Sequence, residues 1–171
     1  LILPEINKLR YMPFRELLST YPDSVLSLAG RYERMIAGFG IEGGEVLIDP
    51  DRYAGFAKSL IHVFRNIVDH GIETPDERID AGKEEYGVIT CSAETVDDHI
   101  LLTIGDDGRG IDLDVIRKRG IEKGLISESD AFTDDEIMKM IFHDGLTTKE
   151  DVTELSGRGI GLAAVRNETE K

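Results

Sequence analysis

Apolar side chains recur along the chain at two different spacings, which predict helices and strands in turn. After Pro22, apolar positions at helical spacing predict a helix that reaches about Ile36, and glycines then lead into a short strand over residues 45–48. A second helix is expected over residues 51–70, where one broad apolar face runs along the segment. The members of this face are Tyr53, Phe56, Ala57, Leu60, Phe64, Ile67 and Val68.

The rest of the chain predicts a hairpin followed by helices. The strands and helices are expected at residues 87–93, 99–105, 112–123, 133–143 and 157–167. The two strands pair across residues 96–98, and Thr133 and Glu136 have the spacing of a capping box for the helix that follows them. This order predicts an α/β (α+β) two-layer sandwich, with helices packed on one face of a mixed, largely antiparallel sheet.

Composition and charge narrow the possible functions. The 171 residues suit one domain, and 20 Lys plus Arg against 34 Asp plus Glu give a net charge of −14. A surface this acidic repels phosphate backbones and anionic lipids, which argues against general binding to nucleic acid or membranes. The single cysteine, Cys91, leaves no disulfide framework within the chain and fits a reducing, cytoplasmic compartment. No apolar run approaches the roughly 18 residues of a membrane span.

One candidate site lies on the polar side of the second helix. At about 100° per residue, His62, Asn66 and Asp69 fall within about 60° of one another. An Asn oxygen suits Mg²⁺ that keeps its waters and bridges phosphates. A His one turn earlier could accept a proton or position a phosphoryl acceptor. The alternative is an ordinary solvated stripe.

Two further motifs combine glycines with polar residues. The sequence DDGRG at residues 106–110 follows an apolar strand, where a carboxylate can accept a hydrogen bond from an exocyclic amine such as that of adenine. A plain turn or a calcium-type loop is the alternative there. The sequence SGRGIG at residues 156–161 opens a helix, whose N–H groups and dipole attract phosphate. A Rossmann unit is excluded because no βαβ unit follows, and no Walker A loop is present.

The order and spacing of these motifs resemble those of the GHKL ATPases, which include gyrase, MutL and the histidine kinases. More narrowly, the chain resembles the ATP-binding catalytic domain of chemotaxis-type (CheA-like) histidine kinases. The most specific stretch is LIHVFRNIVDHGIE at residues 60–73, which is similar to the family's N box. The likeness extends over residues 12–167 and implies a Bergerat fold that binds ATP and Mg²⁺. Its other matching segments are residues 75–78, 81–83, 106–112, 124–126 and 156–161.

The resemblance also implies roles for individual residues. Asn66 is implied as the Mg²⁺ ligand, Asp106 as the partner of the adenine amine, and His62 as the catalytic residue that orients or deprotonates an incoming imidazole. Water-using members carry a Glu where this chain has His62, so phosphoryl transfer to a histidine is expected rather than hydrolysis. Further nucleotide contacts are implied at Arg65, Asp69, His70, Gly108, Gly110, Arg119, Thr147, Lys149, Gly157, Gly159 and Gly161. For Arg119 and Lys149 the alternative is a surface cation.

The resemblance further implies how the chain is organised and what it works with. Residues 1–11 are expected to end a preceding dimerisation or linker helix, and residues 12–171 to form the catalytic domain, with its closing hairpin missing from this sequence. The implied partners are a histidine phosphoacceptor domain, a downstream response regulator and a second copy in a homodimer. One alternative is a degenerate module that binds nucleotide or partners without turnover. This alternative gains some support because the lid-like sequence FHDGLTT at residues 142–148 lacks the family's Pro and second Phe. The other alternative is a water-using GHKL ATPase or serine kinase.

Overall fold

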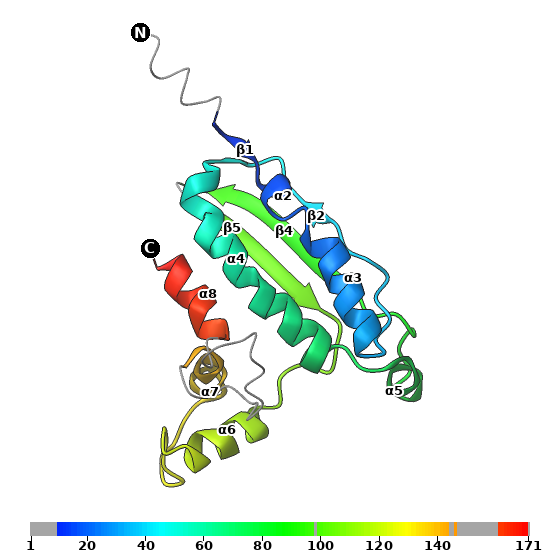
Figure 1. Ribbon diagram of the computed structural model, residues 1–171. Coiled ribbons are helices and arrows are strands. Elements are labelled where there is room, and N and C mark those ends of the chain that lie inside the picture. Colours follow the sequence, from blue (N-terminus) through cyan, green and yellow to red (C-terminus); the bar gives the residue numbers. More distant parts are fainter. Residues whose placement is uncertain (1–9, 98, 144–145, 147–160, 171) are drawn as a thin grey trace. The chain divides into compact units, whose positions relative to one another are not determined.

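The structure of the chain is a computed structural model that describes residues 10–97, 99–143, 146 and 161–170. The chain divides into two compact units, residues 1–109 and residues 110–171. Figure 1 shows the helices and strands that make up each of them. Of the segment expected to end a helix, residues 1–9 lie outside the described residues, and Arg10 and Tyr11 are not helical.

The first unit is built on a mixed sheet of three strands. These are β2 (Ile41–Glu42), β4 (Ile89–Val96) and β5 (His99–Asp106), in the order β2-β4-β5. β2 runs parallel to β4, whereas β4 and β5 form the predicted antiparallel hairpin. A separate antiparallel pair joins β1 (Met12–Pro13) to β3 (Leu47–Ile48), so the predicted strand at residues 45–48 is confirmed in its second half.

The register of the hairpin decides which side chains face the helices. Cys91 lies opposite Ile104 and Ala93 opposite Leu102, and the two β4 residues of these pairs are buried. Ile89, which is also buried, lies opposite Asp106. Because side chains alternate along a strand, Asp106 belongs to the same face as these apolar residues. The last residue of β5 therefore presents a carboxylate on the helix-bearing side of the sheet.

Three helices lie on one face of the sheet, as predicted (Figure 1). They are α2 (Phe14–Leu17), α3 (Tyr21–Arg31) and α4 (Pro50–Asn66). α4 begins in the way its sequence suggests, because the Asp49 carboxylate accepts a hydrogen bond from the Asp51 N–H and Pro50 occupies the first turn.

The apolar face of α4 supplies the centre of the core. Phe64 is fully buried, and its ring centroid lies 4.9 Å from that of Tyr21 and 5.3 Å from that of Phe39. The Tyr21 hydroxyl donates a hydrogen bond of 2.5 Å to the Ala57 carbonyl oxygen, which ties α3 to α4. Five of the predicted face positions are buried, at Ala57, Leu60, Phe64, Ile67 and Val68.

The sequence placed the end of the first helix wrongly in this unit, and it missed a change of helix type near the predicted end of the second. The first helix ends at Arg31 rather than near Ile36, because Glu33 adopts a positive φ of 55° that breaks the helix. Ile36 instead forms a parallel bridge to Gly87 beside the sheet. α4 ends at Asn66 and continues as a π-helical turn, η1 (Ile67–Gly71), in which the Ile72 N–H donates to the Ile67 carbonyl.

A short helix, α5 (Pro75–Asp80), follows η1 and was not predicted. Thr74 and Glu77 form a complete capping box at its start, and Pro75 occupies its first turn. These residues are the standard signal for a helix N-terminus, so the sequence did carry the information. The apolar periodicity on which the prediction relied is too short here to show a helix of six residues.

The second unit is helical in its described part. It contains α6 (Leu113–Glu122), α7 (Asp134–Lys139), the 3-10 turn η2 (Met140–Phe142) and α8 (Leu162–Thr169). The capping box of Thr133 and Glu136 is present, as predicted. Ile116, Ile137 and Leu146 form the buried core of this unit. Among the described residues, no helix combines the length and apolar character needed to cross a membrane.

Candidate functional site

The first group of predicted site residues lies where α4 passes into η1. Asn66 is the last residue of α4, and its backbone is still helical at φ −62° and ψ −41°. The side chains of His62, Asn66 and Asp69 are all partly exposed, while the flanking Ile67 is buried. Single π-turns inside helices occur often at functional sites, because the wider turn redirects the side chains that follow. Here the turn begins directly after the predicted metal ligand.

His62 has an environment that favours its neutral form. Burial lowers the pKa of its imidazole below the ordinary value of 6.5, and the positive charge of the neighbouring Arg65 lowers it further. A neutral imidazole can accept a proton, which is the chemistry that the sequence predicted for this position. His70, further along, places its Nε2 3.8 Å from the Asp69 Oδ2.

The second group of predicted residues, at the end of β5, lies against the end of η1. The Arg109 N–H donates a hydrogen bond of 3.0 Å to the Gly71 carbonyl oxygen. A Cβ added to Gly108 would lie only 2.3 Å from that same oxygen, and one added to Gly71 would lie 3.1 Å from the Asp106 Oδ1. Backbone contact this close requires glycine at Gly108 and favours it at Gly71. The structure therefore brings the predicted Asp106 and Gly108 to the turn that begins after Asn66.

The acceptor groups at this junction are compatible with an amine and with a divalent cation. The exposed Asp106 carboxylate accepts a hydrogen bond of 3.0 Å from the Gly108 N–H at its Oδ1. It retains acceptor capacity for an amine, because an ionised carboxylate has about four lone-pair sites. No cluster of three or more His, Cys, Asp or Glu suited to a metal occurs among the described residues. A single Asn oxygen together with ligand phosphates is a form of coordination that Mg²⁺ accepts, so the donor set is compatible with it.

The remaining predicted residues belong to the second unit. Gly110 adopts a positive φ of 75° with open space around it, so its requirement for glycine is conformational. Arg119 lies in the last turn of α6, and Gly161 caps the N-terminus of α8. Thr147, Lys149, Gly157 and Gly159 lie outside the described residues, as does most of the lid-like sequence. Their predicted roles at the phosphates stay predictions.

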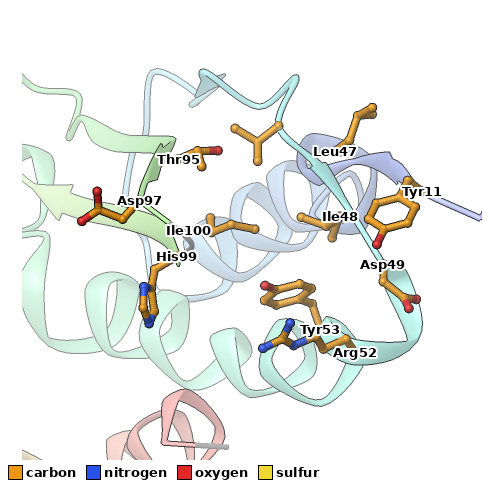
Figure 2. Close-up of a pocket in the computed structure, with 11 residues that line it drawn as sticks. Tyr11, Leu47, Ile48, Asp49, Arg52, Tyr53, Thr95, Asp97, His99 and Ile100 are labelled. Carbon is orange, nitrogen blue, oxygen red and sulfur yellow. The ribbon is translucent and has the colours of Figure 1, made fainter. Parts of the chain in front are cut away.

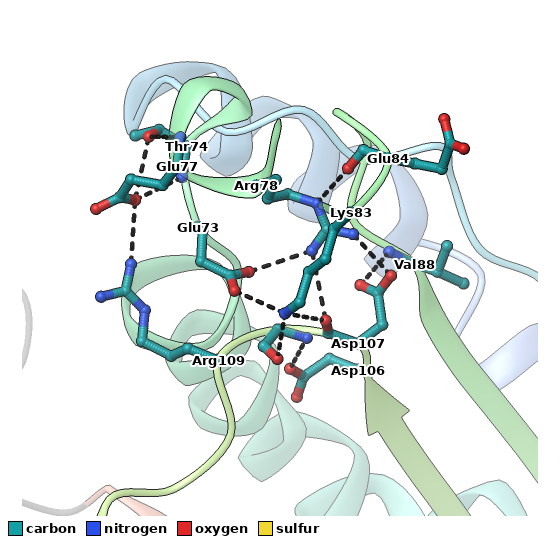
Figure 3. A network of polar contacts seen from close by, with 11 residues as sticks. Glu73, Thr74, Glu77, Arg78, Lys83, Glu84, Val88, Asp106, Asp107 and Arg109 are labelled. Atoms are coloured by element: carbon teal, nitrogen blue, oxygen red, sulfur yellow. Dashed lines mark hydrogen bonds and ion pairs between the residues drawn. The ribbon is translucent and has the colours of Figure 1, made fainter. Parts of the chain in front are cut away.

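Sequence reasoning assigned no role to a group of charged residues beside Asp106. Glu73, Arg78, Lys83 and Asp107 form what we call the charge network (Figure 3). Arg78 is 1 % exposed, which is unusual for an arginine. Two matching segments of the resemblance contained Arg78 and Lys83, but sequence spacing alone could not show that these charges gather around a buried arginine.

A pocket occurs at the opposite end of α4 (Figure 2). Ile48, Tyr53 and Ile100 supply apolar surface there, and Arg52 and His99 supply polar groups. Tyr53 and Asn66 are separated by about 20 Å along the helix axis at about 1.5 Å per residue. The pocket is therefore distinct from the junction of Asn66 and Asp106, and none of the predicted site residues lines it.

Comparison with known proteins places the chain in a family. Residues 55–171 match the family described as histidine kinase-, DNA gyrase B-, and HSP90-like ATPase. The chemotaxis protein CheA of Halobacterium salinarum is 39% identical over 164 residues, covering 95% of this chain and 24% of that protein. The sensor histidine kinase CheAY of Helicobacter pylori is 36% identical over 168 residues, covering 97% of this chain and 21% of that protein.

One solved structure is a histidine kinase domain from the Erythrobacter litoralis blue-light activated histidine kinase, with a TM-score of 0.44 and 14% identity, covering 78% of this chain and 52% of that chain. The chain spans about a quarter of the length of the curated relatives. The match of the family covers more than half of the chain, including the α4 to η1 segment and the end of β5. The chain belongs to the family of histidine kinase-, DNA gyrase B-, and HSP90-like ATPases.

Proposed function

We propose that the chain is the ATP-binding catalytic domain of a two-component histidine kinase. One observation supports this most strongly. The Asp106 carboxylate lies on the helix-facing side of β5. It contacts Gly71, at the end of the turn that begins after Asn66. An acceptor for an amine and an oxygen ligand for a metal thus come from two neighbouring elements. Such an arrangement suits a nucleotide with an exocyclic amine and a phosphate-bound metal ion.

In this proposal each residue of the first unit has a defined task. Asp106 accepts a hydrogen bond from the adenine amine, and Gly108, whose backbone lies against Gly71, lines the base. Asn66 holds Mg²⁺, whose charge would offset that of the phosphates. Arg65, Asp69 and His70 complete the wall beside the nucleotide. Gly110, Arg119, Thr147, Lys149, Gly157, Gly159 and Gly161 are proposed to contact the base or the phosphates.

The reaction we propose is transfer of the γ-phosphoryl group to a histidine of another domain. A new P–N bond forms as the bond to the ADP oxygen breaks, and the accepting imidazole loses a proton. His62 is suited to orient that imidazole or to take its proton, because its lowered pKa keeps it neutral near pH 7. Such transfer depends on positioning and charge neutralisation more than on covalent chemistry by the protein.

The proposal extends to partners that the chain itself does not contain. The relatives named chemotaxis protein CheA and sensor histidine kinase CheAY are about four to five times as long as this chain. We propose that a phosphoacceptor domain, in the same protein or in the partner copy of a homodimer, supplies the histidine. A response regulator then receives the phosphoryl group. The proposed location is the cytoplasm, in keeping with the single cysteine.

Labelled phosphate distinguishes the proposal from its alternatives. The protein carrying this chain, supplied with γ-labelled ATP and Mg²⁺, is expected to acquire label that is lost in acid and kept in alkali, as a phosphohistidine is. Asn66→Ala should abolish the labelling. Label that survives acid would point to a serine kinase, and release of free phosphate without labelling would point to a water-using ATPase. Binding of ATP with neither outcome would point to a degenerate module.

A further inference from the structure

The charge network joins two segments that are distant in sequence. Glu73, Arg78 and Lys83 come from the segment that follows η1 and contains α5, and Asp107 follows directly after β5 (Figure 3). Two acidic and two basic side chains balance one another, so the network brings no net charge to the neighbouring Asp106. With no net charge in the network, we look for its effect on Asp106 in the geometry that its hydrogen bonds impose.

Arg78 holds the centre of the network with all three of its side-chain nitrogens. Its Nε donates a hydrogen bond of 2.7 Å to the Glu84 carbonyl oxygen. Nη1 donates to the Glu73 Oε2 at 3.2 Å, and Nη2 donates to the Asp107 Oδ2 at 2.8 Å. The side chain is 1 % exposed, so these contacts replace its lost hydration. Asp107 is held from a second side, because its Oδ1 accepts a bond of 2.8 Å from the Val88 N–H.

Lys83 acts on the backbone that follows Asp106. Its ammonium donates to the Glu73 Oε1 at 2.7 Å, to the Asp107 carbonyl oxygen at 3.0 Å and to the Gly108 carbonyl oxygen at 2.9 Å. An ammonium group has three donors, and each finds an acceptor here. Two of the three hydrogen bonds go to the main-chain carbonyl oxygens of consecutive residues, Asp107 and Gly108. The lysine therefore fixes the path of the chain directly after β5.

This path determines where the Asp106 carboxylate lies. Its Oδ1 accepts a hydrogen bond from the Gly108 N–H at 3.0 Å, so a shift of Gly108 would move the carboxylate. Among the described contacts, no side chain of the charge network donates to Asp106 itself. The Asp106 carboxylate is thus held by the Gly108 N–H, and Lys83 in turn holds the Gly108 carbonyl oxygen. Its outward acceptor sites stay available to a ligand.

A role in folding alone explains this arrangement less well. Buried ion pairs contribute little net stability, because desolvation of the charges offsets most of their attraction. They do fix geometry, because hydrogen bonds to charged groups are directional and strong. The hydrogen bonds from Lys83 to the carbonyl oxygens of Asp107 and Gly108 contribute more to positioning this backbone than to packing of the core.

We propose that the charge network is a positioning device for the adenine-recognising carboxylate, and that Lys83 is its positioning residue for selectivity toward the exocyclic amine. This inference rests on the proposed function, in which Asp106 accepts a hydrogen bond from adenine. Lys83 does not touch the nucleotide. It sets where the Asp106 carboxylate lies, so its loss reduces the preference for a base with an amine more than it reduces binding in general.

The test compares two nucleotides that differ only in this amine. ATP and purine riboside 5′-triphosphate, which lacks the 6-amino group, are titrated with Mg²⁺ into the 171-residue chain by calorimetry. Lys83→Met is expected to lower the affinity for ATP about tenfold while changing that for purine riboside triphosphate less than about twofold. Lys58→Met is the matched control, because Lys58 is an exposed lysine in α4, and it should change neither affinity.

A second variant keeps the test decisive if Lys83→Met does not fold. Asp107→Asn retains an oxygen for the Val88 N–H but removes the charge that faces Arg78, and we expect it to lower the preference for ATP in the same direction. Equal losses for both nucleotides, or an unchanged preference in the folded variants, would overturn the positioning role. Failure of the wild type to bind either nucleotide would overturn the proposed function itself. Wild-type binding without preference for ATP would overturn the assignment of Asp106 to the adenine amine, and the inference with it.

Discussion

The contact between Gly108 and Gly71 allows a sharp prediction. In Gly108→Ala the new Cβ would lie 2.3 Å from the Gly71 carbonyl oxygen, 2.5 Å from its carbon and 2.7 Å from the Asp106 Oδ1. A carbon and an oxygen approach only to about 3.3 Å, so something must move by about 1 Å. The nearest atoms are backbone, which cannot rotate away. The end of β5 and the end of η1 must therefore separate.

The cost of that separation follows from two contributions. Overpacking of a well-packed contact costs about 1–3 kcal/mol. The hydrogen bond from the Arg109 N–H to the Gly71 carbonyl oxygen would also be lost or lengthened, at about 0.5–1.5 kcal/mol. We therefore expect Gly108→Ala to lower the free energy of unfolding by about 2–4 kcal/mol. Displacement of the Asp106 carboxylate should also weaken ATP binding at least about tenfold.

Urea unfolding and calorimetric titration with Mg-ATP measure the two effects. Gly30→Ala is the matched control, because Gly30 lies in α3 with nothing within 4 Å of an added Cβ. That change should raise stability by about 0.5–1 kcal/mol, since alanine favours a helix, and it should leave ATP binding unchanged. A Gly108→Ala protein as stable as the Gly30→Ala protein, with wild-type affinity, would refute the reasoning.

Three further predictions concern ionisable side chains of the first unit. Arg78→Met should lower the free energy of unfolding, measured in urea, by about 2–4 kcal/mol, because it leaves the buried Glu73 with one partner fewer. Arg15→Met, which removes one partner of an exposed ion pair, is the control and should cost less than about 1 kcal/mol. Similar losses in the two variants would contradict this prediction. Burial raises the pKa of the Glu73 and Asp107 carboxyls, but hydrogen bonds and nearby cations outweigh it and hold each pKa below its ordinary value of 4.5 and 3.8, respectively. The two carboxylates therefore contribute fully to stability above pH 4.5, and this contribution is lost as the pH falls through the lowered pKa values. Unfolding measured as a function of pH should then show a shallower acid slope in Asp107→Asn, and an identical slope would count against this. His62→Ala should bind ATP within about twofold of wild type yet transfer label about 10²–10⁴-fold more slowly, and unchanged transfer would remove its catalytic role.

Much of the first unit could be predicted from periodicity alone. The apolar face of α4 and the alternation in β4 and β5 gave the helix, the hairpin and their packing, because burial of one face dominates the energetics of such elements. The end of the first helix was misplaced because a positive φ at Glu33 leaves no trace in a hydrophobic pattern. The π-turn after Asn66 was missed for a similar reason, since one wider turn hardly alters the apolar spacing.

In the candidate site, too, some features could be predicted from the sequence, whereas others depend on tertiary contacts that the sequence does not show. The family resemblance implied that Asn66 and Asp106 belong to one site, and the structure places Asp106 against the turn that follows Asn66. The charge network could not be predicted, because exposed and buried arginines look alike in sequence and Arg78 is buried only through tertiary contacts. Gly71 was likewise missed, because its role depends on how closely another segment approaches.

The central claim is that the carboxylate at the end of β5 recognises the adenine of ATP. Its most direct test is calorimetric titration of the wild-type chain and of Asp106→Asn with a non-hydrolysable ATP analogue in the presence of Mg²⁺. Loss of one charge-assisted hydrogen bond of about 1.5–3 kcal/mol predicts an affinity roughly 10–100-fold weaker for Asp106→Asn. Equal affinity of the two folded proteins would contradict the claim.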